Sequence, residues 1–313
     1  MKQSINDELE AQLSDFFDAA STYMFTPLTL LKFSKMLFKL DNADPEAGFR
    51  PERRDPDFVL FAARLLKKFT DVYFRPEISG LTTLPETGPG LIIGNHNGGL
   101  VPVDTFLVGG AIVRHFGGQR PLYALAHDFL FREPTLSNVL ERMGTLRASH
   151  RGAELAFERD GLVIVYPGGD HETFRPYTDR HKIDFGERKG FIKLALRRGV
   201  PIYPVVSIGC HEMFYVLTRG EKIAQALGLP KAFRTSVFPI VFSLPWGLTS
   251  GFLPYLPLPK KIHINFLPPH HFDYPPEAAD SAEIVDKCYH EVHLAMQDQL
   301  SVMASARQAD SPL

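Results

Sequence analysis

Residues 94–104 read Gly-Asn-His-Asn-Gly-Gly-Leu-Val-Pro-Val-Asp and combine an imidazole, a carboxylate and flexible glycines in one short segment. An apolar run precedes them, so His96 is predicted at the carboxyl end of a buried strand, where α/β sheets place reactive groups. A neutral imidazole can remove a proton from an attacking hydroxyl, and a carboxylate on its other ring nitrogen fixes the tautomer. We therefore interpret His96 as a general base, Asp104 as its partner and Asn97 as a hydrogen-bonding group for an acceptor. A strand-end histidine bonded only to backbone is the alternative interpretation.

A second predicted strand end carries more ionisable side chains. Residues 163–175 read Val-Ile-Val-Tyr-Pro-Gly-Gly-Asp-His-Glu-Thr-Phe-Arg, which indicates a buried strand and a tight turn followed by Glu172 and Arg175. Residues 144–150 contain a short strand begun by glycine, and residues 200–209 form an apolar strand bracketed by prolines. Because the carboxyl ends of parallel strands meet at one edge of a sheet, we expect these segments to converge on His96.

These four segments, in this order, resemble the four ordered motif blocks of the glycerolipid acyltransferases, the lysophosphatidate acyltransferase-like proteins, over roughly residues 80–269. The resemblance implies that His96 and Asp104 are the catalytic pair. It also implies that the second and third blocks bind the polar head of the acceptor and that the fourth lines the acyl-donor side. The matching residues are Gly144, Arg147, Gly168, Gly169, Glu172 and Arg175 for the acceptor, and Val200, Pro201 and Pro204 for the donor.

The sequence departs from that family pattern at two places. Seven residues separate His96 from Asp104, where the family has four, so Asp170 and Glu172 are the alternative partners of the imidazole. The third block reads Tyr-Pro-Gly-Gly-Asp-His-Glu, which is closer to the diacylglycerol acyltransferase-like branch and its neutral lipid hydroxyl. Acceptors with and without a phosphate both remain open at this point.

The function predicted from these residues is O-acyl transfer from an acyl thioester, on coenzyme A or an acyl carrier protein, to a glycerolipid or lysophospholipid hydroxyl. Thiolate is a good leaving group, so the prediction includes no metal and no organic cofactor, the thioester being a co-substrate. A catalytically silent lipid-binding or membrane-scaffold protein is the main alternative. It need not keep His96 and Asp104 in one cleft with residues 168–175. A serine-type lipid hydrolase is disfavoured because the sequence has no Gly-x-Ser-x-Gly elbow.

Other polar groups carry less weight. His127-Asp128 is interpreted as support for substrate contacts, His211-Glu212 as a strand-end pair that could face the cleft, and His270-His271 as exposed and not metal-binding. The remaining group is a local basic cluster, interpreted as a solvated helix face, of Lys182, Arg188, Lys189 and Lys193.

Composition excludes several classes of protein. With 313 residues, 44% hydrophobic and 22% charged, the chain can bury a sizeable core and is not a disordered polymer. Its 34 basic side chains balance 36 acidic ones, so the overall positive field that drives nucleic-acid binding is missing. Two cysteines, Cys210 and Cys288, are too few for a disulfide scaffold and are interpreted as buried thiols.

The elements that must position the site follow from hydrophobic periodicity. From residue 72 the pattern alternates between short apolar runs and helical stretches, which predicts an α/β fold: a mostly parallel central sheet flanked by helices, with an N-terminal helical lobe. We divide the chain into an amphipathic helical lobe at 1–70, an α/β acyltransferase domain at 71–275, and a C-terminal helix and tail at 276–313. A polar linker is predicted at 41–56, and the last helix is expected to end near Met303.

Two segments are predicted to contact a membrane surface. Within the helical pattern of residues 5–40, one stripe carries Lys32, Lys35 and Lys39. Residues 235–259 contain no formal charge but five prolines, so monotopic insertion is favoured over a spanning helix and over an irregular buried loop. The N-terminus lacks the basic start and apolar run of a secretory signal. We therefore expect a peripheral or monotopic protein at the cytoplasmic face of a membrane.

Overall fold

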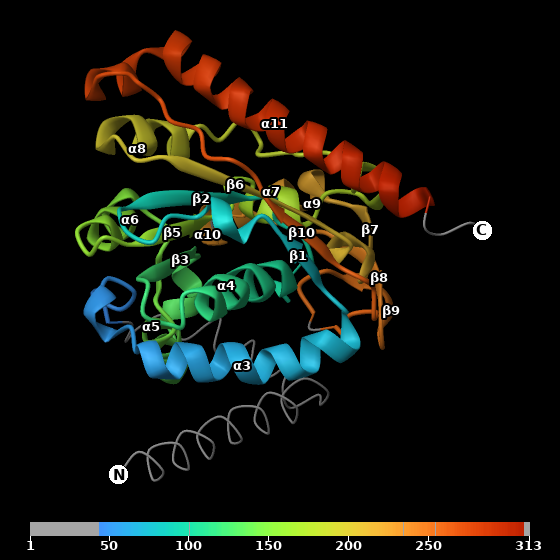
Figure 1. Cartoon of the computed structure of the whole chain (residues 1–313). Helices are drawn as coiled ribbons and strands as arrows, with labels where there is room; N and C mark the ends of the chain where they lie inside the picture. Colours follow the sequence, from blue (N-terminus) through green and yellow to red (C-terminus); the bar gives the residue numbers. More distant parts are fainter. Residues whose placement is uncertain (1–43, 100, 234, 254, 310–313) are drawn as a thin grey trace, which may run out of the picture.

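The computed structural model describes residues 44–309 apart from residues 100, 234 and 254, and a seven-stranded sheet lies at its centre (Figure 1). The strands adjacent to the site, β6, β2, β5, β3 and β4, run parallel to one another. Strand β10 is antiparallel to β6, and β1 is parallel to β10. The mostly parallel α/β fold is therefore confirmed. In sheet order the strands are β1 (Glu77–Ser79), β10 (His263–Phe266), β6 (Ile202–Ile208), β2 (Gly90–Gly94), β5 (Leu162–Val165), β3 (Leu122–Ala126) and β4 (Thr145–Arg147).

Helices cover both faces of this sheet, because successive side chains of a strand point to opposite sides. Leu122 and Leu162 pack into one hydrophobic core, while Tyr123 and Val163 pack into another. The first core includes α4 (Val103–His115), and α3 (Pro56–Tyr73) packs outside α4 (Figure 1). The second core includes the helices α6 (His150–Phe157), α8 (Gly190–Arg198) and α11 (Ala282–Ala309).

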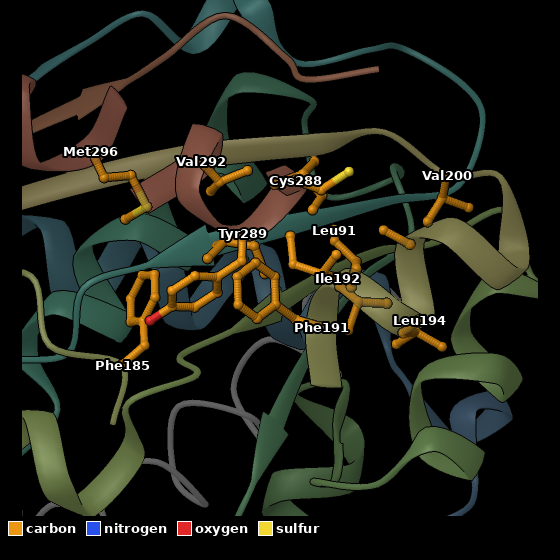
Figure 2. Packing of buried hydrophobic residues seen from close by; sticks show 14 of the residues in the cluster. Leu91, Phe185, Phe191, Ile192, Leu194, Val200, Cys288, Tyr289, Val292 and Met296 are labelled. Carbon is orange, nitrogen blue, oxygen red and sulfur yellow. The ribbon is translucent and has the colours of Figure 1, made fainter. Parts of the chain in front are cut away.

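Helix α11 is an integral part of that second core. Figure 2 shows Tyr289, Val292 and Met296 of α11 in one cluster with Phe191 of α8 and Leu91 of β2. The buried positions of α11 continue at intervals of three and four residues as far as Ala304, which is why the helix runs six residues beyond the predicted end. The helix is preceded by a 3₁₀ turn at Pro276–Asp280.

Part of residues 235–259 is strand, and most of the rest, including residues 255–259, is irregular. They contribute β8 (Ile240–Ser243) and β9 (Gly247–Ser250), which pair with β7 (Tyr215–Thr218) in a three-stranded antiparallel sheet. Val216 and Val241 on one face of this small sheet are buried, whereas Phe242 and Leu248 on its other face are exposed. The strands of this segment therefore have one face packed in the core and one apolar face exposed to solvent.

The described part of the predicted linker, from Asp44 onward, is packed and not loose. Pro51 and Ala47 are buried, and the backbone N–H of Gly48 donates to Glu141 over 2.7 Å. The predicted helix with three lysines lies outside the described residues. None of the helices in the described ranges is long and apolar enough to span a bilayer. The domain boundaries stay a prediction. The remaining helices are α5 (Pro134–Arg142), α7 (Gly169–Thr173), α9 (Glu221–Ala226) and α10 (Leu229–Phe233).

Candidate active site

The site begins where β2 ends, at the carboxyl edge of the parallel strands. Asn95 continues the pairing with β6 through its side chain: its amide nitrogen donates to the Ser207 carbonyl over 2.9 Å and its oxygen accepts from the Ser207 N–H over 2.8 Å. Because a side chain replaces the backbone in the ladder, the main chain is released to turn at His96. Gly98 and Gly99 then adopt φ values of +93° and +59°, a left-handed conformation that favours glycine.

That turn brings His96 and Asp104 together despite the seven intervening residues. The imidazole Nδ1 lies 3.0 Å from Asp104 Oδ2, and the same oxygen accepts the Asn97 N–H over 2.7 Å. Asp104 is in the first turn of α4, where the helix dipole favours a carboxylate. The Asp104 side chain is fully buried, whereas that of His96 keeps 17% of its surface exposed. Nδ1 therefore carries the proton, and Nε2 makes no hydrogen bond with any described residue.

The environment of His96 acts on its charge in opposite directions. Burial disfavours the imidazolium and by itself lowers the pKa of His96, but the charge and hydrogen bond of Asp104, with a smaller effect from Glu172, outweigh it. The pKa of His96 is therefore raised above the ordinary 6.5. This is the property of a base whose protonated form is stabilised by a fixed carboxylate.

Tyr166, directly after β5, packs against one face of the His96 ring. Its ring stacks on that of His96, with centroids 4.5 Å apart and an interplanar angle of 26°. Gly94 leaves room for the stack, because a Cβ there would lie 2.5 Å from Tyr166 Cε1. Burial, and then the charge of Asp104, raise the pKa of Tyr166 well above 10, so the phenol is neutral. Sequence reasoning missed this residue, although it precedes the Pro-Gly-Gly turn.

Glu172 and Arg175 converge on the same loop from α7 and the residues after it. The His96 N–H donates to Glu172 Oε2 over 2.9 Å, and the Asp184 N–H donates to Glu172 Oε1 over 3.2 Å. Burial raises the pKa of Glu172 to about 7, against the opposing effects of Arg175 and these two N–H groups. His96 and Asp104 thus lie together with Glu172 and Arg175, an arrangement that a catalytically silent lipid-binding protein would not need to keep. Glu172 contacts the backbone of His96, not its ring, so it is not the alternative partner.

Asp170 is not that partner either, and Asn97 is not open to an acceptor. Asp170 is bound by Arg188 and by the Thr235 hydroxyl at 2.9 and 2.8 Å. The Asn97 side chain is buried, its nitrogen donates to Asn95 and Ser207, and its oxygen accepts from Arg175. Since all of its hydrogen-bonding groups are used, we correct its predicted role: Asn97 holds the loop.

The predicted acceptor glycines shape the backbone. Gly168 precedes α7, and a Cβ there would lie 2.3 Å from the Cβ of Glu172. Gly169 has φ +48°, and Gly144, with φ +79°, ends α5 against the Leu122 carbonyl. Arg147, at the end of the edge strand β4, donates to the Asp44 carbonyl over 3.1 Å, and its Nε is buried without a partner among the described residues.

Two of the predicted donor residues lie next to the start of β6, away from His96. The Leu91 N–H donates to the Pro201 carbonyl, so Pro201 and Val200 sit beside the start of β2, about 20 Å from its His96 end at 3.3 Å per residue. Pro204 pairs with Ile93 and is buried in the middle of the sheet. Val200 and Pro201 therefore do not line the space beside the imidazole, and their place on the acyl-donor side stays a prediction.

The other histidines have structural surroundings. His211 is buried and donates from Nε2 to the Arg175 carbonyl over 2.7 Å, so it does not open into a cleft. Burial, and then the charge of Arg175, lower its pKa well below 6.5. His127 caps the turn after β3, and His270 is partly buried against Glu291 at 2.8 Å, contrary to the exposure predicted for it. The described residues contain no cluster of ligands suited to a metal ion.

Three of the four residues of the predicted basic cluster have anionic partners. Lys182 pairs with Asp179, Arg188 with Asp170, and Lys189 with both Glu187 and Asp286. Arg219 binds Asp184 and the His171 carbonyl. The predicted basic cluster is therefore largely neutralised. Cys210 and Cys288 are buried and free, as predicted.

The fold is that of the glycerolipid acyltransferases. The chain superposes on the crystal structure of the 1-acyl-sn-glycerophosphate (LPA) acyltransferase PlsC from Thermotoga maritima with a TM-score of 0.51, covering 97% of this chain and 98% of that one at 16% identity. The family model described as Diacylglycerol acyltransferase matches residues 46–288, which include the whole site. The chain belongs to this diacylglycerol acyltransferase family and is an acyltransferase of lipid metabolism, as the motif blocks predicted.

Three relatives illustrate the range of similarity. An uncharacterised protein of Mycobacterium tuberculosis (strain ATCC 25618 / H37Rv) is 30% identical over 269 residues, 85% of this chain and 71% of its own length. The human DGAT1/2-independent enzyme synthesizing storage lipids is 30% identical over 138 residues, 44% of this chain and 41% of its own. Human 2-acylglycerol O-acyltransferase 3 is 30% identical over 102 residues, 32% of this chain and 30% of its own.

Proposed function

We propose that this protein transfers a fatty acyl group from an acyl thioester to the hydroxyl of a glycerolipid, with His96 as the general base. The observation that carries the proposal is the state of the imidazole. Nδ1 is committed to a buried carboxylate at 3.0 Å, while Nε2 makes no hydrogen bond with a described residue and the side chain keeps 17% of its surface exposed. A base needs this combination of a fixed tautomer and an open nitrogen.

The reaction then follows from the positions of these atoms. The acceptor oxygen attacks the thioester carbonyl carbon as its proton passes to Nε2 of His96, and the carboxylate of Asp104 stabilises the imidazolium. Collapse of the tetrahedral intermediate breaks the C–S bond. The thiolate leaves, and the proton returns from the imidazolium to the thiolate or to solvent. The products are an ester and a free thiol, and the proposal needs no metal or organic cofactor, with acyl-CoA or an acyl carrier protein as the donor.

The acceptor we favour is a neutral lipid such as a mono- or diacylglycerol. Recognition of a phosphate requires cationic donors that are free to turn toward it. Arg188 and Arg219, at the edge that holds His96, are bound to Asp170 and Asp184. The family description and the name of human 2-acylglycerol O-acyltransferase 3 agree with an acylglycerol acceptor.

We further propose that the protein docks on the lipid surface through the exposed face of the small sheet, here called the apolar face. Five large apolar side chains on and beside this sheet are exposed to between 43% and 66%: Leu217, Phe242, Leu244, Leu248 and Leu256. Residues 235–259, which supply four of these five side chains, carry no charge, so insertion of this part of the face would bury no ionised side chain of the segment. A single exposed leucine is ordinary, but a group of five on one small sheet is typical of an interaction surface.

The apolar face is directly connected to the site. The hydroxyl of Tyr255, next to Leu256, donates to the Gly98 carbonyl over 2.5 Å. The ring of Phe252 packs edge-on against Phe174, which precedes Arg175. A substrate that reaches the protein through a lipid surface would therefore arrive next to the His96 loop. The proposal thus places a peripheral enzyme at a membrane, with its site close to the contact.

The experiment that tests the proposed chemistry is acyl transfer by the purified protein from labelled acyl-CoA to mono- and diacylglycerol and to lysophospholipids, with separation of the products. His96→Ala should lose about a hundred- to ten-thousandfold of the rate, the usual contribution of a general base. His115→Ala is the matched control, because that histidine is exposed at the far end of α4. A folded His96→Ala protein with near wild-type turnover would refute the assignment.

A further inference from the structure

The guanidinium of Arg175 is surrounded by oxygen atoms of its own chain. Arginine has five N–H groups and no acceptor. Nε donates to the Asp179 carbonyl, and the two terminal nitrogens donate to the carbonyls of Glu172 and Arg180, each over 3.2 Å. Three N–H groups of Arg175 thus tie together the turn that follows α7.

The other two N–H groups of Arg175 reach across to the loop of the general base. Nη1 donates to the His96 carbonyl over 3.2 Å, and Nη2 donates to Asn97 Oδ1 over 2.5 Å. Five donors are therefore matched by five acceptors, none of them from outside the protein. The Arg175 side chain is also fully buried, as is that of Glu172, whose carboxylate lies 3.6 Å from Nη1.

The backbone of Arg175 is held as firmly as its side chain. Its carbonyl accepts from the buried His211, and its N–H donates to the Glu172 carbonyl over 3.1 Å. Asn97, which receives Nη2, is anchored in turn to Ser207 of β6 over 2.9 Å. Hydrogen bonds thus run from β6 and from the turn after α7, through one guanidinium, to the residue that carries the imidazole.

We infer that Arg175 is a positioning residue, which fixes the backbone of His96 and Asn97, and that it does not bind the head of the acceptor. The inference rests on the proposed role of His96. A headgroup ligand would have to displace at least one of the five internal bonds and enter a volume from which solvent is excluded. Breaking a buried, charge-assisted hydrogen bond is costly, whereas the present arrangement satisfies every N–H group.

The two roles predict different kinetics. If Arg175 positions the base, its loss lowers kcat with every acceptor by the same factor and leaves KM nearly unchanged, because a displacement of about 1 Å at the base costs roughly a hundredfold. If Arg175 binds the headgroup, its loss raises KM for a phosphate-bearing acceptor and leaves a neutral acceptor unaffected.

The test uses Arg175→Lys, with Asn97→Ala as a second variant, which removes the side-chain acceptor of Arg175 Nη2 together with the bonds from Asn97 to Asn95 and Ser207. Arg180→Lys is the matched control, since its guanidinium lies over the Tyr177 ring at 4.3 Å and makes no side-chain contact with the His96 loop. Circular dichroism and thermal melts establish which variants are folded. We then measure kcat and KM for lysophosphatidate and for monoacylglycerol with the same acyl chain.

A second measurement does not depend on substrate. The Cε1 proton of His96 is followed by NMR in histidine-labelled protein as pH is varied. A positioning role predicts that the titration of His96 moves in Arg175→Lys and in Asn97→Ala but not in Arg180→Lys. An unchanged His96 titration, together with a selective rise in KM for lysophosphatidate, would overturn the inference.

The outcomes also separate this inference from the proposed function. If His96→Ala is active, the proposed function fails whatever Arg175 does. If His96→Ala is inactive and Arg175→Lys acts only on KM, the function stands and the positioning role fails. If the wild type uses only the neutral acceptor, the role of Arg175 is decided by two results: whether its loss lowers kcat or raises KM for that acceptor, and whether the titration of His96 moves. If Arg175→Lys does not fold, Asn97→Ala supplies the same comparison.

Discussion

Replacing Asp104 with asparagine tests the central pair, because the structure predicts which property of the carboxylate is lost. Oδ2 accepts from both the His96 ring and the Asn97 N–H, whereas Oδ1 accepts from the Thr105 N–H over 2.7 Å. An asparagine must point its NH₂ group at one of these positions. If its NH₂ group faces Thr105, it opposes one backbone donor, while the Thr105 hydroxyl 3.3 Å away can turn to accept from it. If its NH₂ group faces His96, it opposes two donors. The amide oxygen of the asparagine therefore stays toward the His96 ring. The proton of His96 stays on Nδ1, and only the negative charge of the carboxylate is lost.

The size of the effect follows from the 3.0 Å separation of Nδ1 and Oδ2. Two unit charges at that distance interact with about 5.5 kcal/mol at an effective dielectric constant of about 20, and with about 1.4 kcal/mol in water. The carboxylate is buried and the ring is partly exposed, so we take a value of about 3 kcal/mol, which corresponds to about a hundredfold in rate. A reversed tautomer would cost more, on the order of ten-thousandfold.

The assay is the pH dependence of kcat/KM. The base must be neutral, so wild-type activity should fall as pH drops through a pKa above 6.5. Without Asp104, burial lowers the pKa of His96 with little opposition, so the acid limb of Asp104→Asn should move to lower pH. Asp286→Asn is the control, since that carboxylate pairs with Lys189 on the surface. If the acid limb of Asp104→Asn is unshifted and its kcat/KM reaches the wild-type plateau, the carboxylate of Asp104 does not act on the His96 ring.

The same pair predicts a pH-dependent difference in stability. Because the folded pKa of His96 is raised, the pair stabilises the folded state fully below about pH 6.5, the pKa of an unperturbed histidine. That contribution is lost as pH rises through the folded pKa. The free energy of unfolding of the wild type should therefore exceed that of Asp104→Asn by more at pH 6 than at pH 9, measured by urea titration. An equal difference at both values would contradict the shift.

Two further predictions follow from the packing around the site. Gly94→Ala should lower kcat by about tenfold or more, because its Cβ would lie 2.5 Å from the ring of Tyr166, which stacks on the imidazole. Gly109→Ala is the control, since its Cβ meets only ordinary contact at 3.8 Å, and it should stay active. Wild-type kcat in both variants would show that the stacking of Tyr166 on His96 does not matter for catalysis. Phe242→Ser combined with Leu248→Ser should lower the partition constant for lipid vesicles by about a hundredfold or more, because each apolar side chain buried in the lipid contributes about 1.5–3 kcal/mol to binding. Leu294→Ser, an equally exposed leucine on α11, should sediment like the wild type, and equal loss in both would mean that the face has no special role.

Local patterns predicted most of the main sheet, but not β1 (Glu77–Ser79), whose three residues include one apolar side chain. Apolar runs of four to seven residues, separated by helical stretches, indicate buried parallel strands without reference to any distant residue. Once the strands are parallel, their carboxyl ends must share an edge, which is why His96 and Glu172, 76 residues apart, could be expected to converge. The small sheet escaped the same reasoning. Its strands β7 and β8 pair across more than 20 residues of chain, and the prolines around β8 and β9 are typical of an irregular segment.

The sequence by itself determined which side chains have the chemistry for acyl transfer, because the acid–base capacity of His96 and Asp104 belongs to the residue types. Only the tertiary structure decided which polar groups remain open to a substrate. Arg175 and Asn97 look in sequence like ligands for an acceptor, and both are consumed by partners on distant segments, including His96 and Ser207. The physical reason is that a buried donor must be satisfied. Its partners are set by the packing of whole elements, whereas sequence records only that a donor exists.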